Sequence, residues 1–317
     1  MDPSRLLAKA GWLLCAVPLV GVVELALHVK QVSADRIPEE NWTAARDIVK
    51  ADLKAEDLVL FEPFWTDPLG RKFFGPEIAT IKREGRSDEQ RFARAHEVSV
   101  RGFHDEAFAR WKKVGEKRAG AITVTTYENP GHTKVIDDLV DLLTPDRVSV
   151  MRVDAGGETQ CPFSRGSTAG GSTVVPQGLL TPADKFICQG GHVGVAVMHD
   201  LDHRPRLCIY TTPIAGASVK LKFANVTFGD GLYGHAGVQW INDRNPTPER
   251  IALSFSAGGH ALGTHPHKVG TGWTGFELPT EELKGQKADL VVEVAPAKER
   301  YFCWEASTRH APGGGAP

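Results

Sequence analysis

Hydrophobic and polar positions divide the chain into three stretches with different patterns. The first is a nearly continuous apolar run over residues 11–23, which extends with two polar interruptions to residue 29. Arg5 and Lys9 precede the run, and basic residues ahead of an apolar core are typical of a segment whose N-terminus stays in the cytoplasm. The pattern predicts a single-pass signal anchor over residues 11–29, with the bulk of the chain extracytoplasmic, in the periplasm or at the cell surface.

The two interruptions, Glu24 and His28, leave other interpretations open. A full span needs roughly 20 mostly apolar residues, and a carboxylate at the bilayer centre costs on the order of 2.5–3.5 kcal/mol. An anchor would therefore hold both residues near its outer face. A form secreted after cleavage near Ala34 is one alternative, because Val32-Ser33-Ala34 offers the small residues that signal peptidase needs. A buried helix of a soluble protein is the other.

The second stretch, residues 35–154, alternates between helical and strand patterns. Apolar residues at helical spacing predict helices over 41–54, 88–95 and 135–143, and a turn leading into a helix over 101–113. Short β-favouring runs predict strands over 57–61, 96–100 and 121–127, with 62–75 as a loop and 148–153 as a strand or linker. This alternation indicates a small α/β, Rossmann-like domain with a partly parallel sheet. It has neither a GxGxxG turn nor a GxxxxGK(S/T) loop, so we predict no nucleotide cofactor.

The third stretch starts near residue 155 with a connection rich in Gly, Ser and Thr that reaches about residue 180. Short β-patterned runs then recur without helices, over 186–188, 193–198, 206–211, 218–226, 235–241, 250–256, 272–278, 289–294 and 300–305. Such spacing predicts an antiparallel β-sandwich. The chain as a whole is thus predicted to be an α+β multidomain protein. Its parts are a membrane segment at 1–34, an α/β domain at 35–154, a jelly-roll-like sandwich at 155–310 and a disordered tail at 311–317.

Charge and cysteine content narrow the possible partners. The 317 residues carry a formal net charge of -2, which argues against a general nucleic-acid surface. One of the five cysteines lies in the apolar run. The other four fall in the predicted extracytoplasmic region, where disulfides form and persist. We predict the pairs Cys161–Cys188 and Cys208–Cys303, with four buried free thiols as the alternative.

Two loops of the α/β domain carry polar side chains that could meet in a crevice. In an open α/β sheet, ligands bind beyond the carboxyl ends of the strands. If the two strands are neighbours, their loops bring together a set of acidic, basic and aromatic residues: Glu62, Trp65, Asp67 and Arg71 from one, and Arg101, His104 and Asp105 from the other. Such a set could bind a polar headgroup or perform acid–base work. The alternative is that Asp67 caps a turn, Arg71 and Arg101 form surface ion pairs and Trp65 belongs to the core.

Two clusters contain the residue types that bind transition metals. The first is His199, Asp200, Asp202 and His203, although the Arg204-Pro205-Arg206 that follows favours a charged hairpin turn. The second is His260, His265 and His267, which lie among glycines and a proline and which we interpret as solvated side chains of a mobile loop. We therefore predict no metal site, with these residues as the weak candidates.

Aromatic residues of the predicted sandwich could stack on sugars if they are exposed. The candidates are Trp240, Trp273, Trp304, Tyr210, Tyr233 and Tyr301. Tryptophan in a sandwich more often belongs to the core, which is the alternative.

Two parts of the chain resemble known families. Residues 42–65 (WTAARDIVKADLKAEDLVLFEPFW), with HEVSVRG at 96–102 and ITVTTYE at 122–128, resemble the soluble α/β tail of bacterial membrane glycosyltransferases of the protein-mannosyltransferase-like class. The resemblance covers about residues 35–130. It implies an α/β domain that follows a membrane helix, but the chain has no counterpart of the family's catalytic membrane region. GTGWTGFELPTEEL at 270–283, followed by LVVEV and RYFCWEA, resembles the closing strands of jelly-roll, galactose-binding-like modules.

Together these observations favour a binding or structural protein over an enzyme. We expect a membrane-anchored, extracytoplasmic protein that recognises envelope glycans or an envelope protein. The alternative is an enzyme or accessory subunit in the transfer of glycans or lipid-linked sugars, acting through the loops 62–75 and 101–105.

Overall fold

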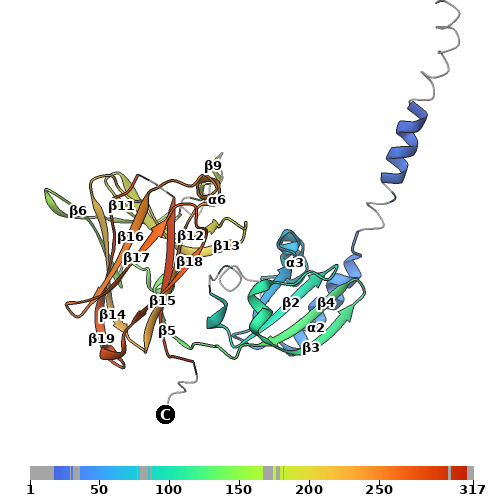
Figure 1. Ribbon diagram of the computed structural model, residues 1–317, viewed down its shortest axis with the longest axis horizontal. Coiled ribbons are helices and arrows are strands. Elements are labelled where there is room, and N and C mark those ends of the chain that lie inside the picture. Colours follow the sequence, from blue (N-terminus) through green and yellow to red (C-terminus); the bar gives the residue numbers. More distant parts are fainter. Residues whose placement is uncertain are drawn as a thin grey trace, which may run out of the picture.

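The computed structural model describes residues 18–28, 30, 36–76, 78, 85, 88–166, 174–175, 179–180, 182–298 and 301–312. Two folded lobes lie side by side, an α/β domain and a larger set of β-sheets (Figure 1). The predicted cleavage site near Ala34 and most of the predicted tail at 311–317 fall outside the described residues.

The apolar run of the N-terminal segment is described only in part. Residues 18–28 are helical, and their large apolar side chains are all exposed. Searched over the described residues, the chain has no helix that is both long enough and apolar enough to cross a bilayer.

The α/β domain has a four-stranded sheet in the order β1-β2-β4-β3, built from Leu58–Glu62, Arg94–Val100, Ile122–Glu128 and Lys112–Ala119. Helices α2 (Glu39–Asp52) and α3 (Asp67–Phe74) pack against one face of it. Trp42 and Val49 of α2 meet Phe61 and Phe74 there, because alternate strand residues point to the same face. The predicted helix at 41–54 and the strands at 57–61, 96–100 and 121–127 are present.

The sheet is partly parallel, as predicted, but most of its pairs are antiparallel, so the Rossmann-like pattern is not confirmed. Only β1 and β2 run parallel, and β4 pairs antiparallel with both β2 and β3. The helices predicted at 88–95 and 101–113 are wrong. Those segments hold short 3-10 helices, η2 (Glu89–Arg91) and η3 (Glu106–Arg110), and give way to β2 and β3. The charged edge strand β3 has a helix-like composition, and pairing with β4 decides its conformation.

Residues 62–75 are not a plain loop, because they contain α3. Pro68 stands in the first turn, where proline is tolerated since its missing N–H has no helical partner there. Gly70 faces the ring of Phe61 so closely that a Cβ at this position would lie 2.3 Å from Cδ1 of the ring. Both residues look like loop markers in the sequence, yet they allow a helix to pack directly on β1.

Residues 135–154 pair with the sandwich sheets and not with the α/β sheet. The predicted helix at 135–143 is a strand, β5 (Val135–Asp138), followed by the single-turn helix α5 (Leu139–Leu142). β5 pairs with β20 (Phe302–Arg309), and β6 (Val148–Asp154) pairs with β14 (Ser218–Thr227).

The remaining strands form two packed antiparallel sheets, as predicted. Within the described residues, one has the order β18-β15-β20-β13-β12-β11-β8 and the other β17-β16-β19-β14-β6-β7. The bounds not yet given are β7 Gly157–Gln160, β8 Phe163–Ser164, β11 Lys185–Cys188, β12 Gly191–His199, β13 Pro205–Thr211, β15 Gly231–Val238, β16 Arg250–Ala257, β17 His260–Lys268, β18 Thr274–Pro279 and β19 Lys287–Val294. The short pair β9 (Val174–Val175) and β10 (Leu179–Leu180), the helix α6 (Trp240–Asp243) and the turn η4 (Glu281–Leu283) complete this part.

Alternating residues of the two sheets meet in one large core. Val219, Leu221 and Phe223 of β14 point inward, while Lys220 and Lys222 between them point outward. Phe255 and Trp304 contact each other edge to face across the core. This alternation is what a sandwich with one buried face per sheet requires.

Both predicted disulfides are present. Cys161 joins Cys188, and Cys208 joins Cys303, so the alternative of four free thiols is wrong. The first bridge joins the segment after β7 to the end of β11, and the second links the neighbouring strands β13 and β20.

Buried ion pairs hold the α/β domain against the sandwich. Arg309 of β20 is fully buried and donates to Asp88 and, at 3.1 Å, to the hydroxyl of Thr133. Arg91 of η2 donates to Asp138 of β5 at 2.7 Å. At the same junction, the end of β1 faces the turn between β12 and β13, since Oε1 of Glu62 lies 3.6 Å from Nη2 of Arg204.

The two disulfides should contribute unequally to stability. They close segments of 27 and 95 residues, for which the chain-entropy model gives about 3.6 and about 4.7 kcal/mol. We expect Cys208→Ala/Cys303→Ala to lower the free energy of unfolding by about 1 kcal/mol more than Cys161→Ala/Cys188→Ala, since all four side chains are similarly buried. Denaturant unfolding of the two double variants measures the difference, and equal losses would contradict this explanation.

Candidate functional site

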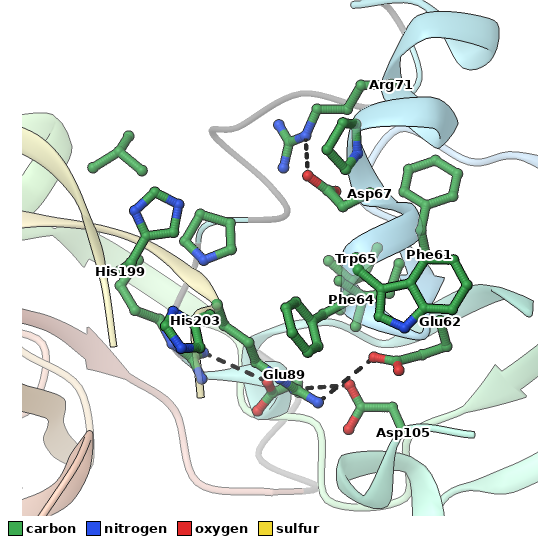
Figure 2. A pocket seen from close by; sticks show the side chains of 17 residues that line it. Phe61, Glu62, Phe64, Trp65, Asp67, Arg71, Glu89, Asp105, His199 and His203 are labelled. Carbon is green, nitrogen blue, oxygen red and sulfur yellow. Dashed lines mark hydrogen bonds and ion pairs between the residues drawn. The ribbon is translucent and has the colours of Figure 1, made fainter. Parts of the chain in front are cut away.

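A cavity of about 570 Å³ lies between the two folded lobes. One wall consists of β1 and the start of α3, and the other of β12, β13 and their connecting turn (Figure 2). Its volume falls in the range of roughly 300–1,000 Å³ that is typical of small-molecule sites.

The α/β wall combines aromatic and charged side chains. Phe64 and Trp65 follow β1 in the short 3-10 helix η1 (Phe64–Thr66), and about half of each side chain is exposed. Asp67 and Arg71 lie one turn apart on α3 and form an ion pair of 2.7 Å between Oδ2 and Nε. Figure 2 shows this pair at one end of the cavity and Glu62 with Asp105 at the other.

The sandwich wall is a turn whose shape depends on Asp200. Oδ1 of this buried side chain accepts hydrogen bonds from the backbone N–H groups of Asp202 and Arg204, at 3.0 and 2.9 Å. His203 adopts a left-handed conformation with φ of 62°. The predicted charged hairpin turn is therefore confirmed. It aims the rings of His199 and His203 and the guanidinium of Arg204 into the cavity.

Carboxylates gather around two arginines at the floor of the cavity. Arg204 lies 2.8 Å from Oδ2 of Asp105 and 3.6 Å from Oε1 of Glu62. Arg206 donates from Nε to Oδ2 of Asp200 at 2.7 Å, and its Nη1 lies 3.9 Å from Oε1 of Glu89. Burial raises the pKa of Glu89, and Arg206 partly opposes that rise.

The pKa of the Glu62 carboxyl is raised to near neutral pH. Burial, together with the neighbouring Asp105 carboxylate, raises its pKa from 4.5 to about 7, against the opposing effect of Arg204. Because Arg204 is closer to Asp105 than to Glu62, it offsets only part of the cost of burying a second carboxylate. At neutral pH, Glu62 is therefore divided between its acid and its ionised form.

The histidines of the sandwich wall offer nitrogen atoms and ring faces. Burial lowers the pKa of His199, with Asp200 acting in the opposite direction. The ring of His203 lies between those of Phe64 and Trp240, at centroid distances of 6.3 and 4.7 Å. Its position extends the aromatic surface of Phe64 across the cavity.

The cavity contains five of the seven residues predicted for the crevice: Glu62, Trp65, Asp67, Arg71 and Asp105. The two others lie apart from it. Nδ1 of His104 is 2.8 Å from Oε2 of Glu97, and Arg101 lines a smaller depression with Trp65. A role for these residues in ligand binding stays a prediction.

Neither predicted histidine cluster forms a metal centre. Over the described ranges, no three His, Cys, Asp or Glu side chains converge in a way that could hold a metal ion. The interpretation of His260, His265 and His267 as a mobile loop is wrong, because they belong to β17. His267 is buried, and burial, with His265 nearby, lowers its pKa to about 4. Pairing with β16 orders a stretch that its glycines and proline mark as a loop.

The sandwich aromatics considered for sugar stacking are buried or half-buried, and stacking by the half-buried ones stays a prediction. Trp304 and Tyr210 are buried, and Trp240, Trp273, Tyr233 and Tyr301 are only partly exposed. The exposed aromatic side chains in the described residues are Phe64, Trp65 and Phe103, all from the α/β domain.

Sequence reasoning missed several residues of the cavity, namely Phe64, Glu89, Arg204, Pro205 and Arg206 among others. Arg204 and Arg206 looked like ordinary turn residues, and Glu89 stood in a segment predicted as helix. Only the packing of the turn onto the other domain brings these residues together.

No family model matches the chain, and no curated protein matches it. Solved structures that it resembles include the K2 cleaved adhesin domain of Lys-gingipain, at 14% identity, 33% coverage of this chain and 74% of that chain, and a TM-score of 0.24. A CBM51 module from Clostridium perfringens GH95, in complex with methyl-galactose, shows 10% identity, coverages of 55% and 97%, and a TM-score of 0.24. TmCBM61, in complex with β-1,4-galactotriose, shows 15% identity, coverages of 33% and 69%, and a TM-score of 0.22. Likenesses of this size support no inference about what the chain binds, and none of these proteins supports the resemblance of residues 35–130 to a mannosyltransferase-like tail.

The raised pKa of Glu62 makes stability depend on pH. The folded state holds this proton up to about pH 7, whereas an unfolded glutamate releases it near 4.5. The free energy of unfolding therefore falls as pH rises through this window, by on the order of 1–3 kcal/mol. We expect Glu62→Gln to remove this part of the decline between pH 5 and 8, as measured by urea unfolding at each pH. The matched control is Glu56→Gln, because Glu56 lies at an exposed turn. If the free energy of unfolding of wild type and of Glu62→Gln changed in parallel with pH, the raised pKa of Glu62 would be contradicted.

Proposed function

We propose that this chain is a membrane-anchored, extracytoplasmic binding protein that takes a sugar into the cavity between its α/β domain and its sandwich. The observation that carries the proposal is the half-exposed pair Phe64 and Trp65 on one wall of the cavity, next to buried hydrogen-bonding groups. Sugar rings stack their apolar faces on aromatic side chains, while their hydroxyls need charged or polar partners.

The polar groups of the floor suit a hydroxyl-rich and largely uncharged ligand. Glu62, Asp105 and Arg204 lie within one network, so each can exchange part of its ion pairing for hydrogen bonds to hydroxyls. The cavity holds acids and bases of nearly balanced charge. This balance favours a neutral sugar over a strongly anionic ligand.

The placement outside the cytoplasm rests on the two disulfides and on the N-terminal segment. Disulfides persist in oxidising compartments. The helix of residues 18–28 is mostly apolar, with Glu24 and His28 as its polar residues, and it exposes its large apolar side chains, as a segment that lies in lipid would. Basic residues ahead of it favour an N-terminus in the cytoplasm.

Removing the aromatic wall should weaken sugar binding. We expect Trp65→Ala to lower the affinity of the purified full chain for its best ligand on a glycan array by about 5- to 150-fold, as loss of a ring contact of about 1–3 kcal/mol implies. Calorimetric titration of that ligand measures the change. Phe103→Ala is the matched control, since this aromatic side chain is also exposed but does not line the cavity. An equal loss in both variants, or none in Trp65→Ala, would contradict the assignment of the site.

A second function, acid–base catalysis on a glycan, is favoured by one observation. Glu62 has a pKa of about 7 and lies beside the carboxylate of Asp105. A carboxyl that is partly protonated at neutral pH can donate a proton to a leaving oxygen, while an ionised neighbour stabilises positive charge or activates water.

Turnover separates the two functions. If the cavity is catalytic, a panel of aryl glycosides releases its phenol in the presence of the chain, and Glu62→Gln lowers kcat by about 100-fold or more because the acid is lost. The same variant should still bind a sugar ligand, because glutamine keeps the shape and the hydrogen-bonding capacity of the side chain. Binding without turnover on the panel would leave the first function as the better description.

A further inference from the structure

Exposed apolar side chains gather at one edge of the α/β domain. Of the seven large apolar side chains that are exposed between residues 36 and 312 of the described chain, four belong to this edge. They are Phe64 at 46%, Trp65 at 52%, Leu69 at 45% and Phe103 at 48%. Single exposed apolar residues need no explanation, but a concentration of them marks an interaction surface.

The topology of the sheet explains why these four residues share an edge. β1 and β2 are parallel neighbours, with Glu62 opposite Ser99, so the segments that follow both strands leave the sheet on the same side. Trp65 and Leu69 line a depression of about 180 Å³ together with Arg36, Ile37 and Arg101. The first residues of the folded domain therefore border the apolar surface.

Basic side chains surround the same surface. Arg36, Lys72 and Arg101 are exposed, and Glu39 is shared between Arg36 at 4.0 Å and Lys72 at 3.7 Å. Tryptophan and phenylalanine beside arginine and lysine is the composition of a protein surface that lies at a membrane–water interface. On such surfaces, aromatic rings lie at the boundary between headgroups and acyl chains, and cations meet anionic headgroups.

The N-terminal segment identifies the partner. Residues 18–28 are helical and mostly apolar, with Glu24 and His28 as the polar exceptions, and the described part of the folded domain begins at residue 36. We propose that the surface formed by Leu69 and Phe103, beside the cavity rim of Phe64 and Trp65, rests on the phospholipid bilayer that holds this helix, so that the cavity opens towards the lipid headgroups. The sugar bound there is then the headgroup of a lipid. This inference rests on the membrane anchoring proposed above.

The test locates a fluorescent label relative to the lipid. The full chain in a Cys15→Ala background receives an NBD label at Leu69→Cys, at Phe103→Cys or, as a control on the sandwich, at Ile187→Cys, which is also exposed. Each variant is reconstituted into vesicles of phosphatidylcholine with one part in about five of phosphatidylglycerol. Nitroxide-labelled phosphatidylcholine should quench the labels at 69 and 103 at least about threefold more than the label at 187, because the surface lies in the interface.

The outcomes separate this inference from the proposed function. If the chain floats with the vesicles but all three labels are equally accessible to water, the chain is anchored and the surface does not contact lipid. If the labels at 69 and 103 are shielded from water yet not quenched by the nitroxide, a second protein copy covers the surface, and the inference is overturned. If the chain does not float with the vesicles, both the proposed membrane anchoring and this inference are wrong. Sugar binding in the cavity is tested separately, by titration of the ligand.

Discussion

Arg309 lies at the end of a sandwich strand, is fully buried, and reaches Asp88 and Thr133 in the segments that flank the α/β sheet. Arg91 crosses the same junction in the other direction to Asp138. Removing one partner of a buried pair leaves a charge without compensation and typically costs about 3–5 kcal/mol. These two arginines therefore fix the distance between the domains, and the cavity depends on that distance because each domain supplies one of its walls.

In the cavity, too, the cost of burying charged side chains is set against the ion pairs that they form. The sandwich turn places one guanidinium, that of Arg204, near the carboxylates of both Glu62 and Asp105. One cation cannot compensate two buried anions equally, and burial, together with the Asp105 carboxylate, raises the pKa of the farther one, Glu62, to about 7. The same arrangement gives hydrogen-bond donors and acceptors to a hydroxyl-rich ligand. Binding and proton transfer are thus two possible uses of one electrostatic arrangement.

Local sequence features predicted the strands whose apolar pattern is complete in itself, such as 57–61, 121–127 and most of the sandwich. They failed where the conformation depends on a neighbour. β3 is charged along most of its length and is a strand because it pairs with β4. β17 contains the glycines and the proline of a loop, yet it pairs with β16 over its full length. Helix α3 was not predicted because Pro68 and Gly70 favour a loop in the sequence. The structure shows that Gly70 lets the helix pack against the ring of Phe61.

The sequence by itself determined the order of the parts, the two disulfides and five of the side chains that line the cavity. Cysteine number and apolar periodicity can be read directly from the chain, whereas the pairing of β1 with β2 was only a condition of the predicted crevice, which the structure fulfils. Only the tertiary structure decided that the turn carrying His199, His203 and Arg204 forms the opposite wall. That turn is separated from β1 by well over a hundred residues, and its position follows from the buried arginine pairs at the junction, which no periodicity in the chain records. The raised pKa of Glu62 follows from the same packing, because the fold both buries this carboxyl and places it beside the Asp105 carboxylate.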